Sequence, residues 1–176
     1  MTSMTWKALA VCAALAAATP VAAQESNQPV ASHSDWSVYV AGSPKECYIM
    51  TQPKSSDARR GGASVTVERG LIRLFVTFRP ADEVANEVSF SSGYPLAEPV
   101  RVEVGSDTFS LSPGTGEAND WAWPATPADD ARLVAAMRRG ADAKVTGVST
   151  RGTTTIDTFS LIGFTAAVNE AEERCR

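Results

Sequence analysis

The sequence predicts a mainly β domain, a β-sandwich or jelly roll of antiparallel sheets, with two short helices. Apolar and polar residues alternate over many short runs, which is the pattern of half-buried strands. Glycine and proline end most of these runs, as they do in sandwiches and barrels. Two stretches, near 127–139 and 164–174, instead repeat apolar residues at helical spacing. We expect a single domain over residues 35–176, since a chain of this size buries a full core.

The expected strands follow one another from residue 36 onward. Alternation and flanking turn residues place them at 36–40, 46–51, 63–68, 71–78, 87–92, 100–104, 107–111 and 157–161. The runs 63–68 and 71–78 are joined by Arg69 and Gly70, and this short turn predicts a β-hairpin. The polar stretch 53–62 is expected to be a loop.

The pentapeptide DTFSL occurs twice, at Asp107–Leu111 and Asp157–Leu161. Such a pair is consistent with an internal repeat, a functional signature or two similar strands. Alternation puts the Asp, Phe and Leu side chains on one strand face, with Phe and Leu toward the core. Because the flanking residues differ, we interpret the copies as two similar strands, and an adjacent pair is one arrangement that this allows.

Capping signals mark the two helices. Thr126 suits the N-cap of the first helix, Pro127 its first position and Asp129 a capping-box partner. Gly140 suits the position that follows its C-terminus. The apolar face of the second helix consists of Phe164, Val168, Ala171 and Cys175.

The N-terminus has the organisation of a signal peptide over residues 1–23. Lys7 supplies a positive charge, residues 8–18 form an apolar run, and small residues lead up to a cleavage site after Ala23. We therefore expect a periplasmic or secreted bacterial protein; an uncleaved N-terminal anchor is the alternative. The polar residues 24–34 are expected to form a flexible arm.

The cysteine count agrees with export. Cys12 leaves with the signal peptide, and the mature chain retains Cys47 and Cys175. In an oxidising compartment an even number of cysteines predicts a disulfide, here Cys47–Cys175; two free thiols are the alternative. His33 is the only histidine, so no metal site and no cofactor are expected.

The net charge argues against a nucleic-acid partner, and the lengths of the apolar runs argue against a transmembrane segment. Removal of Lys7 with the signal peptide leaves 15 basic and 20 acidic residues, a net charge of −5. An acidic domain without clustered Lys and Arg is a poor nucleic-acid binder, so no nucleic-acid partner is expected. No run after residue 23 is long and apolar enough for a transmembrane segment.

The sequence predicts no catalytic residues, and we expect a protein that is not an enzyme. A serine triad would depend on His33, which lies in the expected arm, and no nucleophile-elbow motif is present. Two carboxylates suffice for a glycosidase. The alternative function is therefore a small periplasmic carboxylate-dependent hydrolase acting on carbohydrate or peptidoglycan.

Three aromatic residues form a candidate binding patch. Tyr94 lies in a Gly-Tyr-Pro loop, and Trp121 and Trp123 share one face of a short strand. Exposed, these rings would form a recognition surface. The alternative is that they cap the core beside the first helix.

Several stretches resemble the invasion-associated locus B family of exported bacterial proteins. The most specific stretch is a glycine-threonine turn, the second DTFSL and the start of the closing helix, Ser149–Ala167. The others are Trp36–Tyr39, Pro44–Tyr48, Glu87–Pro95, Trp121–Pro124 and Ala136–Gly140. The resemblance implies a β-rich, secreted, periplasmic or envelope-associated protein with no established enzymatic activity. Together with the signal peptide and the missing catalytic residues, it leads us to expect a protein that binds an unknown protein or envelope component. It implies no catalytic residue.

Overall fold

The computed structural model describes residues 28–176 of the chain. The predicted signal peptide, its cleavage site after Ala23 and residues 24–27 of the predicted arm lie outside the described residues. Within residues 28–176, no helix is both long and apolar enough to cross a membrane.

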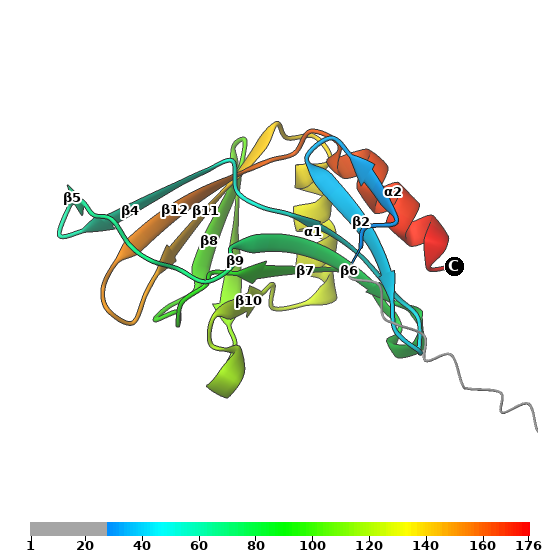
Figure 1. Ribbon diagram of the computed structural model, residues 1–176, viewed down its shortest axis with the longest axis horizontal. Coiled ribbons are helices and arrows are strands. Elements are labelled where there is room, and N and C mark those ends of the chain that lie inside the picture. Colours follow the sequence, from blue (N-terminus) through cyan, green and yellow to red (C-terminus); the bar gives the residue numbers. More distant parts are fainter. Residues whose placement is uncertain (1–27) are drawn as a thin grey trace, which may run out of the picture.

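Twelve strands form one antiparallel sheet in the order β1-β2-β3-β6-β7-β10-β9-β8-β11-β12-β4-β5. The strands are β1 (Ala31–His33), β2 (Trp36–Ala41), β3 (Glu46–Thr51), β4 (Ser55–Arg60), β5 (Ala63–Ser64), β6 (Arg73–Arg79), β7 (Val84–Ser91), β8 (Val100–Val104), β9 (Asp107–Pro113), β10 (Trp121–Trp123), β11 (Asp142–Val148) and β12 (Thr154–Ser160). The helices are α1 (Pro127–Met137), α2 (Phe164–Arg174) and the 3₁₀ turns η1 (Pro80–Asp82) and η2 (Gly116–Ala118). Figure 1 shows β4 and β5 at one end of the molecule and α2 at the other.

The sheet curls so that its two halves pack against each other. β7 and β12 are five strand positions apart, which would be about 24 Å in a flat sheet. The rings of Phe90 on β7 and Phe159 on β12 nevertheless meet edge to face, with centroids 6.1 Å apart. Trp36 on β2 also reaches β12, where its Nε1 donates a hydrogen bond to the carbonyl of Ser160. The mainly β prediction is confirmed, with one curled sheet in place of separate sheets.

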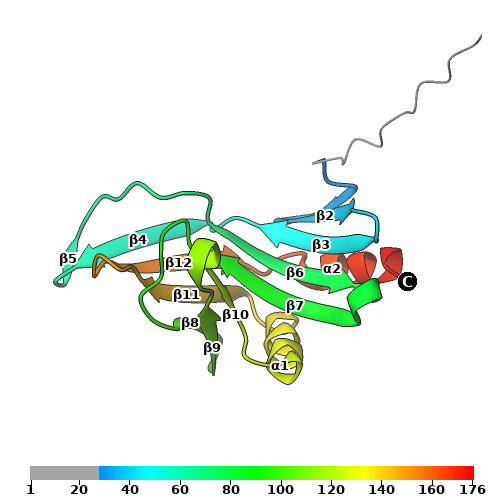
Figure 2. The same cartoon turned by 90° about the horizontal axis from the view of Figure 1, so that it is seen from below.

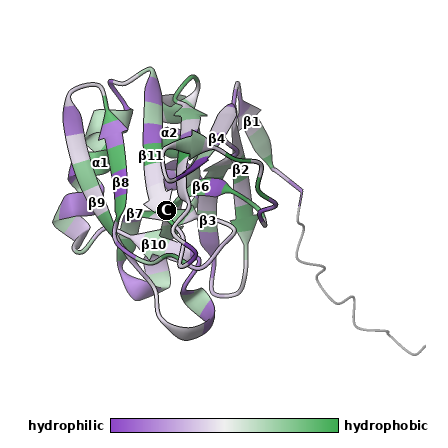
Figure 3. Cartoon of the chain, turned by 90° about the vertical axis from the view of Figure 1, so that its left-hand side faces the viewer, coloured by the Kyte–Doolittle hydropathy of each residue, from purple (hydrophilic) through white to green (hydrophobic). Residues whose placement is uncertain are grey.

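Strand alternation builds the core. On β8, Val100 and Val102 are fully buried, whereas Arg101 between them is exposed. Figure 3 shows hydrophobic and hydrophilic residues alternating along β8 and β11. Where alternation is this regular the predicted bounds are those observed, as for 46–51 and 100–104.

Both predicted helices are confirmed. Thr126 is the N-cap of α1, and its Oγ1 accepts a hydrogen bond from the Asp129 amide at 3.2 Å. The helix ends at Met137, slightly before the predicted end at 139. α1 packs against β7, while α2 packs against β2 and β3 through a buried face that includes Phe164 and Val168.

The predicted hairpin of 63–68 with 71–78 is wrong. Only Ala63 and Ser64 form a strand, which pairs with β4, and β6 pairs with β3 and β7 instead. The segment between β5 and β6 does not form a hairpin turn. Its Arg69 forms an ion pair with Asp157 on β12.

The predicted loop at 53–62 contains a strand. β4 (Ser55–Arg60) pairs with β12, and most of its side chains are exposed on both faces. Its sequence therefore lacks the apolar alternation that identifies a half-buried strand. β11 (Asp142–Val148), which lies between β8 and β12, also was not predicted.

The two DTFSL segments are strands, β9 and β12, but they are not neighbours. β8 and β11 lie between them in the sheet. In the second copy Asp157 and Phe159 are fully buried, and Leu161 is 6% exposed, as the alternation predicts. In the first copy Asp107 is exposed and only Leu111 is fully buried. The same five residues therefore have different environments.

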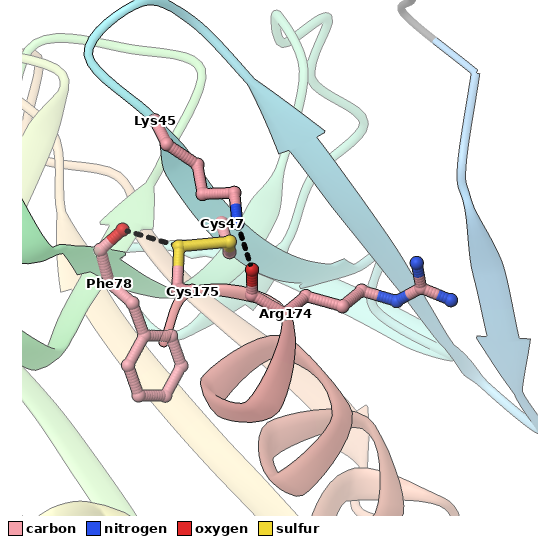
Figure 4. Close-up of a disulfide and its surroundings, with 5 residues drawn as sticks. All are labelled: Lys45, Cys47, Phe78, Arg174 and Cys175. Carbon is pink, nitrogen blue, oxygen red and sulfur yellow. Dashed lines mark hydrogen bonds between the residues drawn. A yellow bond between two sulfur atoms is a disulfide. The ribbon is translucent and has the colours of Figure 1, made fainter.

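A disulfide joins α2 to the sheet. Cys47 on β3 and Cys175, directly after α2, are bonded, with Cα atoms 5.8 Å apart (Figure 4). Beside it, Lys45 Nζ donates a hydrogen bond to the carbonyl of Arg174 at 2.6 Å. Cys175 Sγ lies 3.7 Å from the Phe78 carbonyl oxygen. That is a packing contact, since a disulfide sulfur carries no proton.

The described part of the predicted arm is ordered against the domain. Ala31–His33 form β1, which pairs with β2, and His33 Nε2 hydrogen-bonds with Glu170 of α2. Gly163 makes this approach possible, since a Cβ there would lie 2.0 Å from the His33 carbonyl oxygen. The prediction of a flexible arm over 24–34 is therefore wrong for residues 31–33, which form a strand of the sheet.

Candidate functional site

A row of five aromatic side chains crosses the sheet on the face opposite the helices. The row consists of Tyr39 (β2), Tyr48 (β3), Phe75 (β6), Trp121 and Trp123 (β10), and we call it the aromatic row. Successive ring centroids are 4.8, 6.1, 5.3 and 6.2 Å apart. All five side chains are half-buried, so each ring keeps part of its surface in solvent.

Strand alternation explains why these rings share one face. β3 buries Cys47 and Ile49 toward α2 and therefore directs Tyr48 outward. β10 buries Ala122, which places Trp121 and Trp123 on the outer face. The sequence could not assign these tryptophans to the core or to the surface, and the structure places them outside, in mutual contact.

Short side chains on β7 leave hollows within the row. Ser91 lies between Arg73 of β6 and Trp121 of β10 in the strand register, and Ser89 lies opposite Phe75. The rings of Phe75 and Trp121 meet above this floor, with a hollow of about 360 Å³ on one side and one of about 300 Å³ on the other. We call the two hollows together the outer groove.

The first hollow contains a complete ion pair. Arg79 donates to both carboxylate oxygens of Glu87, each at 3.0 Å. This pairing raises the pKa of the Arg79 guanidinium. Glu46, Thr77 and Ser89 add further polar groups to the same hollow.

The second hollow contains Arg73, which, unlike Arg79, has no carboxylate partner among the described residues. Arg73 lies beside Ser91, Asp120 and Trp121, and its Nε is buried without a hydrogen-bond partner among residues 28–176. Asp120 lines the same hollow but forms no ion pair with Arg73. Leu71, which is 63% exposed, lies at the rim.

Tyr94 is not part of the aromatic row. Its ring lies under the guanidinium of Arg69, 4.9 Å from the ring centroid to Cζ, and its hydroxyl is 2.7 Å from Thr155 Oγ1. Burial raises the pKa of the Tyr94 hydroxyl, while the hydrogen bond to Thr155 and the charge of Arg69 oppose that shift. The three aromatic residues grouped from the sequence therefore belong to two different places.

Arg69 and Asp157 form a buried ion pair beside Tyr94. Two guanidinium nitrogens lie 2.8 Å from the two carboxylate oxygens, and the side chains are 7% and 0% exposed. Arg69 also donates to the carbonyl of Ser92, and Ser56 donates to Asp157. The pair thus joins β4, β12 and the end of β7, which is a structural role.

A polar pocket of about 590 Å³ lies over this pair. It is lined by the side chains of Arg60, Arg151, Ser149, Thr153 and Thr155, among others. Arg60 donates to the Oγ1 of Thr153, the residue before β12, at 2.6 Å. Sequence reasoning missed this pocket, because its residues come from β4, from the segment between β5 and β6, from the loop after β7, from the β11–β12 connection and from β12.

Residues 28–176 contain no group of three or more His, Cys, Asp or Glu placed to hold a metal ion. Asp130 is a buried carboxyl on α1 that accepts a hydrogen bond from the Val88 amide at 2.8 Å. Burial raises the pKa of Asp130 to about 6. It lines neither the outer groove nor the polar pocket.

Comparison with known proteins gives the chain a family. The crystal structure of invasion associated protein B from Bartonella henselae superposes with a TM-score of 0.56 at 19% identity, covering 82% of this chain and 96% of that one. At that identity the likeness shows a shared fold. No curated protein matches the sequence. The family model for invasion associated locus B (IalB) protein matches residues 36–172. Because this match spans most of the sequence, the chain belongs to the IalB family.

Proposed function

We propose that this chain is an exported, non-enzymatic protein that binds a protein or another envelope component through the aromatic row. The single observation that carries the proposal is the row itself, five half-exposed rings in continuous contact across β2, β3, β6 and β10. Aromatic side chains bury large apolar areas when covered and are frequent anchors in binding surfaces. Their placement on a solvent-facing sheet supports recognition over core packing.

Export is supported by three independent features. The first 23 residues have the organisation of a signal peptide, the chain belongs to the IalB family, and Cys47 and Cys175 form a disulfide. The intact mass of the protein in the periplasmic or secreted fraction should be that of a chain whose first residue is Gln24. A mass that retains residues 1–23, or that includes a lipid, would contradict this part of the proposal.

The arrangement of carboxylates favours binding over hydrolysis. A glycosidase needs two carboxyl groups across a cleft, one of them with a raised pKa. Asp130 has a raised pKa, but it is 7% exposed and faces Val88 beneath α1. In the outer groove Glu87 is held by Arg79 through two hydrogen bonds.

Capture from native envelope extract tests the binding role. We expect wild-type protein to retain specific partners and Trp121→Ala or Trp123→Ala to lose them. Ile162→Ala is the matched control, since Ile162 is 63% exposed but lies outside the aromatic row. Thermal melting of each variant separates lost binding from lost folding. Two folded tryptophan variants that retain every wild-type partner would overturn the proposal.

A further inference from the structure

Three arginines near β6 differ in their partners. Arg69 has Asp157, and Arg79 has Glu87, in both cases through two hydrogen bonds to one carboxylate. Arg73 lies between them in the chain and has no hydrogen bond or ion pair with any residue of the described part. A guanidinium fits a carboxylate or phosphate in a planar, bidentate arrangement. Residues 28–176 thus supply no acceptor for Arg73, which leaves its guanidinium open to water or to a ligand.

Arg73 lies where the lack of a hydrogen-bond partner is unfavourable, which points to a ligand-binding role. The side chain is half-buried in the second hollow, beside the ring of Trp121, and its Nε is out of contact with solvent. Buried polar groups without partners are rare in native proteins, and each lost hydrogen bond is unfavourable. A ligand that reorients the guanidinium and accepts from it would remove this penalty.

We propose that the outer groove binds an acidic oligosaccharide, with sugar rings against the aromatic row and an acid group on Arg73. This inference rests on the proposed function, because it names the chemistry of the partner for the same surface. Two hollows flank the Phe75–Trp121 contact, which suits an occupant built of at least two linked rings.

The sheet face favours a glycan over a peptide. β6 and β7 are each paired on both sides, so their backbone donors and acceptors are used within the sheet. An extended peptide lying on this face would find no backbone partners, unlike a peptide added at a sheet edge. Sugar rings have apolar C–H faces that pack on aromatic rings, and hydroxyl groups that hydrogen-bond with short polar side chains.

The polar side chains of the outer groove suit the hydroxyl and acid groups of such a glycan. Ser89 and Thr77 in the first hollow offer hydroxyls, and Asp120 in the second offers an acceptor for a sugar hydroxyl. Arg73 is the cation of the second hollow, and it forms no ion pair with Asp120 or any other described carboxylate. The chain is acidic overall, with a net charge of −4, so acidic ligands gain little from non-specific attraction. Selectivity for an acid group should therefore depend on Arg73.

Titration calorimetry with defined sugars tests the proposal. The probes are a galacturonic acid tetrasaccharide, the same tetrasaccharide as its methyl ester, and a peptide-free peptidoglycan glycan whose N-acetylmuramic acid has a free lactyl carboxylate. We expect at least one acidic probe to bind the wild-type protein. The affinity of the Arg73→Gln variant for that probe should be lower by about tenfold or more, the loss typical of a charged hydrogen bond. The neutral ester should bind weakly to both proteins. Arg101→Gln is the control, because Arg101 is an exposed arginine of β8 paired with Glu103.

The outcomes separate this inference from the function on which it rests. If envelope capture depends on Trp121 and Trp123 but neither acidic probe binds, the glycan assignment is wrong and the binding role stands. Equal affinity for acid and ester, or an Arg73→Gln variant that binds like wild type, also overturns the role of Arg73. If the tryptophan variants bind both probes and envelope partners normally, the inference and the proposed function both fail.

Discussion

Arg69 and Arg73 are four residues apart in the chain, yet their surroundings are opposite. Arg69 is 7% exposed and bonded to Asp157 and Ser92, whereas Arg73 has no partner within residues 28–176. A buried arginine with four hydrogen bonds to acceptors belongs to the fold, because removal of a partner leaves an uncompensated charge. An arginine without acceptors, beside half-buried aromatic rings, contributes little to the fold and is available to a ligand. Stability and binding measurements on the two sites should therefore give opposite results.

The largest effect should come from the Arg69–Asp157 pair. Asp157→Ala leaves the guanidinium buried without its carboxylate, and we expect the free energy of unfolding to fall by about 3–5 kcal/mol. Denaturant unfolding measures this loss. Asp142→Ala is the control, since Asp142 pairs with Lys54 at an exposed position and such pairs contribute about 0–1 kcal/mol. Equal unfolding midpoints for the two variants would show that the buried pair has no special role.

The disulfide should give the next largest effect. Cys175→Ser is expected to lower stability by about 2–5 kcal/mol, because the bond closes a loop with a sequence separation of 128 residues. Proteolysis should begin near Glu170–Arg174, since the start of α2 keeps its own anchor in the edge-to-face contact of Trp36 and Phe164. Cys47→Ser removes the same bond and is expected to match. A Cys175→Ser protein that melts with wild type would contradict the prediction.

The fold was predictable where burial produces a periodic sequence. β3, β8 and α2 have the predicted bounds because each buries one regular face against the core. β4 was missed because it is exposed on both faces, so that pairing with β12, and not burial, defines it as a strand.

The candidate site was predictable only in its tryptophans. Trp121 and Trp123 share one face once their segment is a strand, so their pairing follows from alternation. The contact of Trp121 with Phe75 depends on the order β6-β7-β10, which no local pattern encodes. The Arg69–Asp157 pair likewise joins residues 88 positions apart. Tyr94 was grouped with the tryptophans by residue type and loop position, which do not report the direction of a side chain.

A third test concerns pH and the buried carboxyl of Asp130. Its folded-state pKa of about 6 lies above the ordinary value of 3.8, so the folded state disfavours the charged form. Below about pH 4 the carboxyl is protonated in both states and adds no penalty. Between about pH 4 and 6 the penalty grows as the pH rises, up to about 3 kcal/mol above pH 6.

Asp130→Asn isolates this contribution. The amide oxygen of asparagine can still accept from the Val88 amide, but it does not ionise. Other carboxylates act in the reverse sense: the hydrogen bond from His33 lowers the pKa of Glu170, so its contribution is lost in acid. We therefore compare wild type with Asp130→Asn at each pH. Their stability difference should increase from pH 4 to 6, and a constant difference would contradict the prediction.

The smallest effect on stability is expected at Arg73, and it completes the comparison. Arg73→Gln keeps part of the apolar stem beside Trp121 and removes a positive charge that forms no ion pair within residues 28–176. We expect the free energy of unfolding to change by less than about 1 kcal/mol, the range of substitutions that break no contact. Arg69→Gln, the matched change at the paired arginine, should lose about 3 kcal/mol or more because Asp157 is then buried alone. Denaturant unfolding of both variants side by side measures the contrast. An Arg73→Gln loss as large as that of Arg69→Gln would mean that Arg73 holds the sheet together, and its availability to a ligand would then be wrong.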